Sequence, residues 1–295
     1  MRFKKAVIWG HKLHSHTHSY VHNAFYRAFQ AMGYDTLWLG NEDDISGLDL
    51  SNSIFITEGQ TCKNMPLIKG STYVLHNCYD EGMWNTINSQ GIDYLKLQVY
   101  TDDVLAYETV KLEPCTYHDA PGKMLYMPWA TDLLPDEISL IPSTDHTRKV
   151  WWVGTMGTGT FGNMTELSGF IHACKDNAIE FEHANNLSVE ENRARIAQSY
   201  MAPTIVGTWQ KGKGYIPCRI FKNISYGQFG ITNSARVQEL FEGRLVYSDS
   251  EYHLFNAAID RRAAPNYNVE FRNLIEFVRD KHTYINRINT ILSVI

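Results

Sequence analysis

One stretch of the chain, residues 214–234, restricts the possible folds more than any other. It opens with a loop rich in glycine and proline, continues into an amphipathic helix that carries Arg219 and Lys222, and ends in a short apolar strand followed by Asn233 and Ser234. This order is typical of a parallel α/β sheet, where backbone N–H groups and the helix dipole favour an anion at the helix N-terminus. An arginine there adds a two-pronged hydrogen bond. The stretch therefore predicts a place for a diphosphate.

Length and composition predict two globular domains. The chain has 295 residues, of which 44% are hydrophobic and 20% are charged, enough for two cores of ordinary size. The net charge of −5 lacks the basic excess that nonspecific binding to nucleic acid or membranes requires. No apolar run reaches the ~18 residues that span a bilayer.

Cysteine usage and the amino-terminal residues predict a cytoplasmic protein. The five cysteines are scattered and include no Cys-x-x-Cys pair, as expected of reduced, mostly buried thiols. Residues 1–10 carry charges but only a four-residue apolar stretch. We therefore expect a first strand there and not a signal peptide.

The first half of the chain alternates short apolar runs with helical or loop segments. The runs are largely continuous, which is typical of parallel strands covered by helices on both faces. A helix is predicted over residues 22–32, where apolar side chains share one face and Gly33 ends the pattern. This order of elements opens a Rossmann-like unit. The predicted strands are 6–9, 36–39, 53–57, 72–76, 95–100 and 123–127.

A weakly patterned segment with two prolines, residues 133–147, predicts a linker, after which the α/β pattern restarts. A strand at 150–154 leads into a glycine-rich loop at 155–163 and a helix at 165–175. Further strands are predicted at 179–183, 204–207, 229–232 and 244–248, with helices at 189–198 and 235–242 and one or two amphipathic helices in the last thirty residues.

These patterns predict an α/β fold with two Rossmann-like domains, residues 1–132 and 148–262, facing each other across a cleft. Residues 263–295 are expected to form a C-terminal helical segment. Open α/β sheets bind ligands at the carboxyl ends of their strands, so the cleft is the expected site.

Three parts of the chain carry a family pattern. The first is strand 6–9 with the polar loop 10–19 and the following helix; the second is Leu125–Asp132; the third is Trp151–Gly154 together with residues 214–234. In these parts the chain resembles the GT-B-fold glycosyltransferases of the group 1 kind. The resemblance implies a second domain that binds a nucleotide diphospho-sugar, UDP- or GDP-linked, and a first domain that supplies the acceptor pocket.

The resemblance also implies the reaction. It indicates a hexosyltransferase-like enzyme that moves the sugar to an acceptor hydroxyl, without a bound metal or other cofactor and with retention of the anomeric configuration. One departure concerns the two glutamates that group 1 enzymes usually carry eight positions apart, because the matching positions here are Gly214 and Lys222. The resemblance therefore implies the fold of the family more directly than it implies the roles of individual residues. The acceptor stays open among a glycan, a protein, a small molecule and a modified nucleobase.

The candidate donor-binding residues lie at strand ends and on the helix of the second domain. Arg219 with Lys222 would stabilise the departing diphosphate; the alternative is a solvated helix face. An arginine in the first turn of a helix is unfavourable against the dipole unless an anion is present. Ser234, and Asn233 beside it, could instead cap the next helix. The full set is Gly154, Thr155, Arg219, Lys222, Asn223, Asn233 and Ser234.

The candidate catalytic residues are His16, His18 and Glu58. His16 and His18 belong to a run of five histidines in and after the loop that follows the first strand. One of the two would contact the acceptor hydroxyl or act as general base near neutral pH; the alternative is a polar loop with chance histidines. Glu58 and His76 end the third and fourth strands, and Glu58 could bind the acceptor, act as base or cap a loop.

Two other functions stay open. Leu13–Ser19 resembles the His-x-His opening of the PHP class of metal-dependent phosphoesterases, in which His14, His16 and His18 would hold metals. That class needs a Thr-Asp-His turn about thirty residues later, whereas the chain has it only at 144–146, in the expected linker. The second is a catalytically silent nucleotide-sugar-binding protein, to which the missing glutamates point.

Overall fold

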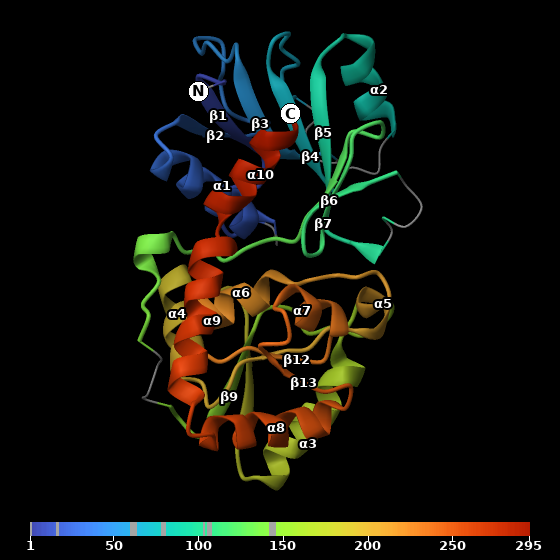
Figure 1. The fold of residues 1–295 in the computed structure, drawn as a ribbon. Coiled ribbons are helices and arrows are strands. Elements are labelled where there is room, and N and C mark those ends of the chain that lie inside the picture. Colours follow the sequence, from blue (N-terminus) through green and yellow to red (C-terminus); the bar gives the residue numbers. More distant parts are fainter. Residues whose placement is uncertain are drawn as a thin grey trace. The chain divides into compact units, whose positions relative to one another are not determined.

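A computed structural model describes residues 2–295 except 16–17, 60–63, 78–80, 103, 105–107 and 142–145. The chain divides into two compact units (Figure 1). Unit 1 comprises Met1–Val99, Val104–Leu134 and Tyr284–Ile295, and unit 2 comprises Tyr100–Asp103 and Pro135–Thr283. The expected α/β class is confirmed, because each unit is built on parallel strands joined by helices.

Unit 1 contains one eight-stranded sheet in the order β2-β1-β3-β4-β5-β8-β7-β6. All neighbours from β2 to β8 pair in parallel, whereas β6 and β7 form an antiparallel hairpin at one end. The hairpin was not predicted, because β6 is exposed along its whole length and has no apolar run. The strands are β1 Lys5–Trp9, β2 Asp35–Leu39, β3 Ser53–Glu58, β4 Thr72–His76, β5 Asp93–Gln98, β6 Val110–Glu113, β7 Thr116–Asp119 and β8 Met124–Tyr126.

Among its described residues, unit 1 has the helices α1 (Ser19–Ala31), α2 (Glu81–Ser89) and α10 (Tyr284–Val294). Helix α1 buries one apolar face against the sheet, and Gly33 follows it with a φ of 82°, a left-handed conformation that suits glycine. Helix α10 lies against α1 (Figure 1), with the rings of Phe25 and Tyr284 4.7 Å apart. The last helix thus completes the core of unit 1, although it is distant from that core in sequence.

Unit 2 contains two small parallel sheets. One pairs β9 (Lys149–Val153) with β10 (Glu180–Ala184), and the other has β12 (Ile231–Thr232) between β11 (Pro203–Thr204) and β13 (Val246–Tyr247). A short 3-10 turn, Pro135–Glu137, precedes them. The helices are α3 Met164–Asp176, α4 Val189–Gln198, α5 Thr208–Lys211, α6 Cys218–Ser225, α7 Ala235–Leu240, α8 Glu251–Ala263 and α9 Tyr267–Lys281.

The helices of unit 2 connect its parallel strands and cover them. Helix α3 packs along α8 (Figure 1), and α9 packs on α6. Helix α4 begins with a capping box in which Ser188 and Glu191 satisfy each other's backbone N–H groups. In the described part of the chain, no helix is long and apolar enough to cross a membrane.

Candidate functional site

Histidines surround one carboxylate at the carboxyl ends of the central strands of unit 1. Strands β1, β3 and β4 are parallel neighbours, so their carboxyl ends meet at one edge of the sheet. Glu58 ends β3 and His76 ends β4, whereas His11 follows β1. His18 directly precedes α1, and His22 lies one turn further on. Neighbouring imidazole centroids are 5.0 to 6.4 Å apart. We call these five residues the histidine cluster.

Glu58 is the hydrogen-bond acceptor at the centre of this cluster. Its Oε1 accepts hydrogen bonds from His18 Nδ1 at 3.1 Å and from Asn77 Nδ2 at 3.2 Å, and its Oε2 pairs with His11 Nε2. Burial alone would raise the pKa of Glu58, but the hydrogen bonds from His18 and Asn77 and the electrostatic interaction with His18 hold that pKa well below its ordinary value. A carboxylate with so low a pKa takes up no proton at neutral pH. These contacts suit Glu58 to orienting the histidines, a role that the sequence did not predict, and its predicted roles stay predictions.

The other two histidines of the cluster form a buried pair with fixed protons. The carbonyl of Gly10 can only accept, so the 3.0 Å contact with His22 places a proton on Nδ1 of that ring. His22 Nε2 then accepts from His76 Nε2 at 2.8 Å. Burial lowers the pKa of His22 to about 4 and lowers that of His76 well below its ordinary value. Both rings are therefore neutral at pH 7, and His76 Nδ1 has no hydrogen-bond partner among the described residues.

The remaining histidines of the loop are His14 and His16. His14 Nδ1 contacts the hydroxyl of Tyr20 at 3.3 Å, and His16 lies outside the described residues. No group of three or more His, Cys, Asp or Glu side chains is positioned to hold a metal ion in the part of the chain that the structure describes. The roles predicted for His16 and for a metal-binding loop stay predictions.

In unit 2, the guanidinium of Arg219 lies at the carboxyl end of β9. Arg219 is in the first turn of α6, its Nη1 donates to the carbonyl of Val153, and its Cζ lies 3.8 Å from the ring centroid of Trp152. Gly154 has a φ of 112°, and a Cβ there would meet Arg219 Nη2 at 2.9 Å. Only glycine therefore combines this backbone conformation with space for the guanidinium.

The charge of Arg219 is partly desolvated. Its side chain is half-buried, and burial lowers its pKa to about 10. Among the described residues, no carboxylate lies within ion-pair distance of it. A cation held in this way is a candidate to bind an anionic ligand.

Of the other residues predicted to bind the sugar donor, some lie at the surface and others are buried. Thr155 is exposed, and its carbonyl accepts from Trp152 Nε1; the ammonium of Lys222 lies 5.8 Å from the ring centroid of Tyr226. The side chains of Asn223, Asn233 and Ser234 are buried.

These three buried side chains have structural partners. Asn223 donates to the carbonyl of Ala202, and Ser234 caps α7. Asn233 bonds both backbone groups of Val206 and donates to Glu251. The structure thus gives their side chains packing and capping roles, because polar groups in the interior must find partners there. Direct contact with a donor stays a prediction for all seven residues.

Unit 2 has an open pocket of about 430 Å³ at the carboxyl ends of β12 and β13. The lining contains the predicted Asn233 and Ser234 but also residues that the sequence did not single out. The signal that could have found some of these was their place just after an expected strand, at 235–236 and 249. The lining residues are Asp102, Lys211, Asn233, Ser234, Ala235, Arg236, Glu239, Tyr247 and Asp249.

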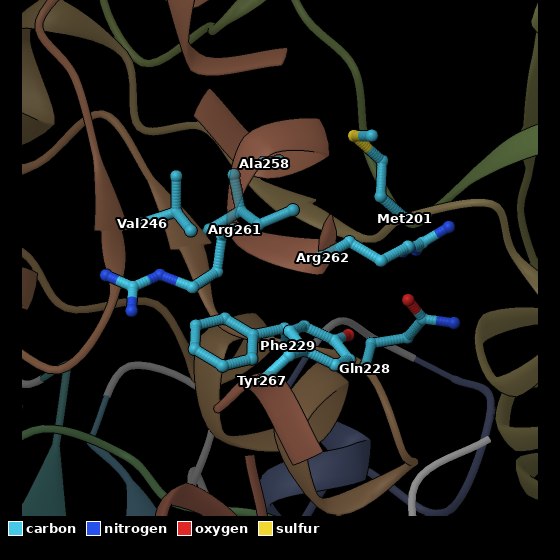
Figure 2. A pocket seen from close by; sticks show the side chains of 9 residues that line it. Met201, Gln228, Phe229, Val246, Ala258, Arg261, Arg262 and Tyr267 are labelled. Carbon is cyan, nitrogen blue, oxygen red and sulfur yellow. The ribbon is translucent and has the colours of Figure 1, made fainter. Parts of the chain in front are cut away.

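A second cavity lies toward the amino ends of β11 and β12. Figure 2 shows the rings of Phe229 and Tyr267 side by side and the guanidinium groups of Arg261 and Arg262 pointing in opposite directions. Arg261 pairs with Glu270, and Arg262 donates to the carbonyl of Tyr200. The cavity volume of about 10 Å³ has room for about one water molecule, so no substrate fits there.

Comparison with known proteins gives distant likenesses among solved structures but none in sequence. No protein-family model matches the chain, and no curated protein sequence matches it. Among solved structures, the chain is similar to the T4 phage protein BGT, whose crystal structure contains its substrate UDP-glucose. The two are 10% identical, the match covers 95% of each chain, and the TM-score is 0.48.

Proposed function

We propose that this protein is a glycosyltransferase that moves a sugar from a nucleotide diphospho-sugar to an acceptor hydroxyl. The observation that carries the proposal is Arg219, a half-buried cation without a carboxylate partner among the described residues, at the carboxyl end of β9. Ligands of parallel α/β sheets bind at that edge. A diphosphate there would offset the desolvated charge and accept bidentate hydrogen bonds from the guanidinium.

In this proposal, Arg219 acts on the leaving group. The bond between the anomeric carbon and the diphosphate oxygen breaks, and negative charge accumulates on that oxygen. The guanidinium stabilises this charge more strongly than it does the charge of the bound donor, which is what accelerates a reaction. Backbone N–H groups at the start of α6 and Lys222 would assist. No cofactor beyond the nucleotide-sugar is needed.

The histidine cluster acts on the acceptor. The acceptor hydroxyl oxygen forms the new bond to the anomeric carbon and loses its proton. His18 hydrogen-bonds the ionised Glu58, and this contact would orient the imidazole toward the acceptor hydroxyl. The family resemblance implies retention of configuration and no bound metal, and both belong to the proposal. Under retention, the proton passes to the departing diphosphate and His18 orients the hydroxyl.

A ligand screen with a product assay tests the proposal. Unfolding temperatures of the full chain are measured with UDP, GDP, UDP-glucose, GDP-mannose and AMP. A ligand at 100 times its Kd adds about 2.7 kcal/mol to the free energy of unfolding. We expect stabilisation by at least one nucleoside diphosphate or its sugar, and not by AMP. Release of the diphosphate from the bound donor, in the presence of water or an acceptor panel, shows catalysis.

Two outcomes contradict the proposal. No shift with any nucleoside diphosphate would remove the donor site. Binding without hydrolysis or transfer would identify a catalytically silent binding protein.

A further inference from the structure

Asn77 combines a left-handed backbone with a hydrogen bond to the carboxylate of the histidine cluster. Its φ is 48°, in the region that glycine, asparagine and aspartate adopt most readily. Of these three residue types, only asparagine carries a side-chain N–H group. The position therefore needs a left-handed residue and a hydrogen-bond donor at once, and asparagine is the type that supplies both.

The end of β4 places this donor beside Glu58. Strands β3 and β4 pair in parallel with Glu58 opposite His76, and the N–H of Gly59 donates to the carbonyl of His76 at 3.1 Å. Asn77 is the first residue after β4, and its Nδ2 donates to Oε1 of Glu58 at 3.2 Å. The register of two neighbouring strands thus fixes this contact between side chains that are 19 positions apart.

The amide of Asn77 also contacts the ring of His18. Its Nδ2 lies 3.1 Å from Nε2 and 3.5 Å from Nδ1 of that ring. Because the amide nitrogen is close to both ring nitrogens at once, it lies against the ring and not along the lone pair of either nitrogen. His18 Nδ1 and Asn77 Nδ2 reach the same oxygen of Glu58, at 3.1 and 3.2 Å. Amide, imidazole and carboxylate therefore form one compact triangle.

Asn77 is the donor of this triangle that does not titrate. Among the described residues, the titratable groups that face Glu58 are the four imidazoles of the histidine cluster, which come from the loop after β1, from the start of α1 and from the end of β4. An imidazole can gain or lose a proton within the ordinary pH range, whereas an amide cannot. The hydrogen bond from Asn77 is therefore the same at every pH at which Glu58 is ionised.

We propose that Asn77 is a positioning residue of the candidate acceptor site, where its amide holds the Glu58 carboxylate and the His18 ring in their hydrogen-bonded arrangement. It acts on the reaction through His18. The inference rests on the proposed function, which gives His18 its contact with the acceptor hydroxyl, and it deepens that function by naming the residue that keeps His18 in place.

Two substitutions separate the hydrogen bond from the backbone conformation. Asn77→Gly retains the left-handed backbone and removes the amide. Asn77→Asp retains the size of the side chain but turns a donor into an acceptor, so that two carboxylates oppose each other until they share a proton. Asn52→Gly and Asn52→Asp are the matched controls, because Asn52 has a φ of 50° and precedes β3 at the end opposite Glu58.

NMR on the full chain, without any substrate, measures the hydrogen bond directly. The observable is the rate at which the Nδ1–H proton of His18 exchanges with water, with its signal assigned by its loss in His18→Gln. We expect this exchange to be at least about 10-fold faster in Asn77→Gly than in the wild-type protein and in Asn52→Gly, the effect of losing one hydrogen bond to a charged group.

The pH dependence of turnover gives a second readout. With UDP-glucose or GDP-mannose as donor, kcat of Asn77→Gly should lie about 10-fold below that of the wild-type protein at each pH from about 8 to about 6, with KM for the donor unchanged. The deficit of Asn77→Asp should shrink as the pH falls, because a protonated carboxyl donates to Glu58 as the amide does.

Two results would overturn the inference and leave the proposed function standing. One is proton exchange and turnover in Asn77→Gly that equal those of Asn52→Gly. The other is a deficit of Asn77→Asp that is independent of pH and equal to that of Asn77→Gly, which would assign Asn77 to packing alone. Unfolding temperatures are measured for all variants, and Asn77→Asp carries the test if Asn77→Gly does not fold. Failure of the proposed function would instead appear as no turnover by the wild-type protein, and the exchange measurement would still decide the role of Asn77.

Discussion

The buried His22–His76 pair shows how single residues constrain unit 1. The Nε2–H of His76 donates to Nε2 of His22, and the Gly10 carbonyl holds the single ring proton of His22 on Nδ1. A second proton between the rings would place two N–H groups face to face. The pair is therefore held in the neutral form, surrounded by His11, His18 and Glu58.

This pair predicts a loss of stability in acid. The pKa of His22 is about 4 in the folded protein against 6.5 ordinarily, so the unfolded chain binds more protons between these two values. The free energy of unfolding then rises with pH across this window and falls by about 3 kcal/mol as the pH drops from 6.5 to 4. His76 acts in the same direction. Urea unfolding at several pH values checks this, with His22→Gln expected to give a weaker pH dependence. Equal slopes for both proteins would contradict the assignment.

A second prediction for a single residue concerns the effect of Glu58 on the rate of sugar transfer. Glu58→Gln removes the ionised acceptor of His11 and His18, so kcat should fall by about 100-fold, a typical contribution of acid–base machinery. Binding of the nucleotide should change little, because Glu58 belongs to unit 1. Steady-state kinetics and calorimetry measure the two effects, and Glu42→Gln, at an exposed position of the same unit, is the control. Full activity of Glu58→Gln would exclude this role.

At the scale of elements, the backbone contact between the glycine-rich loop and Gly207 makes a prediction about stability. A Cβ at Gly207 would lie 2.0 Å from a backbone oxygen, whereas one at Gly212 would meet its nearest atom at 3.5 Å. Gly207→Ala should therefore destabilise the protein by about 2–4 kcal/mol, and Gly212→Ala by less than about 1 kcal/mol. Chemical denaturation compares them. Similar values for the two variants would show that the loop does not pack this closely.

The elements were predictable where one local signal determines them. Apolar runs indicated the parallel strands of unit 1, and Gly33 correctly marked the end of α1. The hairpin at 110–119 was not predicted because its first strand is exposed and has no apolar run. The residues of the candidate sites were likewise predictable only in part. Glu58 and Arg219 could be named from strand and helix ends, but the approach of Asp102 to Arg236, 134 positions apart, depends on tertiary packing that no local pattern encodes.

For the whole molecule, we expect sugar transfer without a metal. Transfer should be unchanged after dialysis against EDTA, because Arg219 and helix N–H groups take over the neutralisation of the diphosphate. The anomeric proton signals of the product should show the configuration of the donor. Loss of activity in EDTA that Mn²⁺ or Zn²⁺ restores would contradict metal independence, and a product of opposite configuration would contradict retention.

The most direct test of the central claim compares two arginines that both stack on tryptophan in unit 2. Arg219 lies over Trp152, and Arg195 lies over Trp151 with its Cζ 4.6 Å from the ring centroid. Arg219→Ala should lower kcat/KM for sugar transfer by about 10²–10³-fold, the cost of one charged donor to the leaving group, whereas Arg195→Ala should change it less than about twofold. Equal kcat/KM values for the two variants would show that Arg219 does not hold the diphosphate.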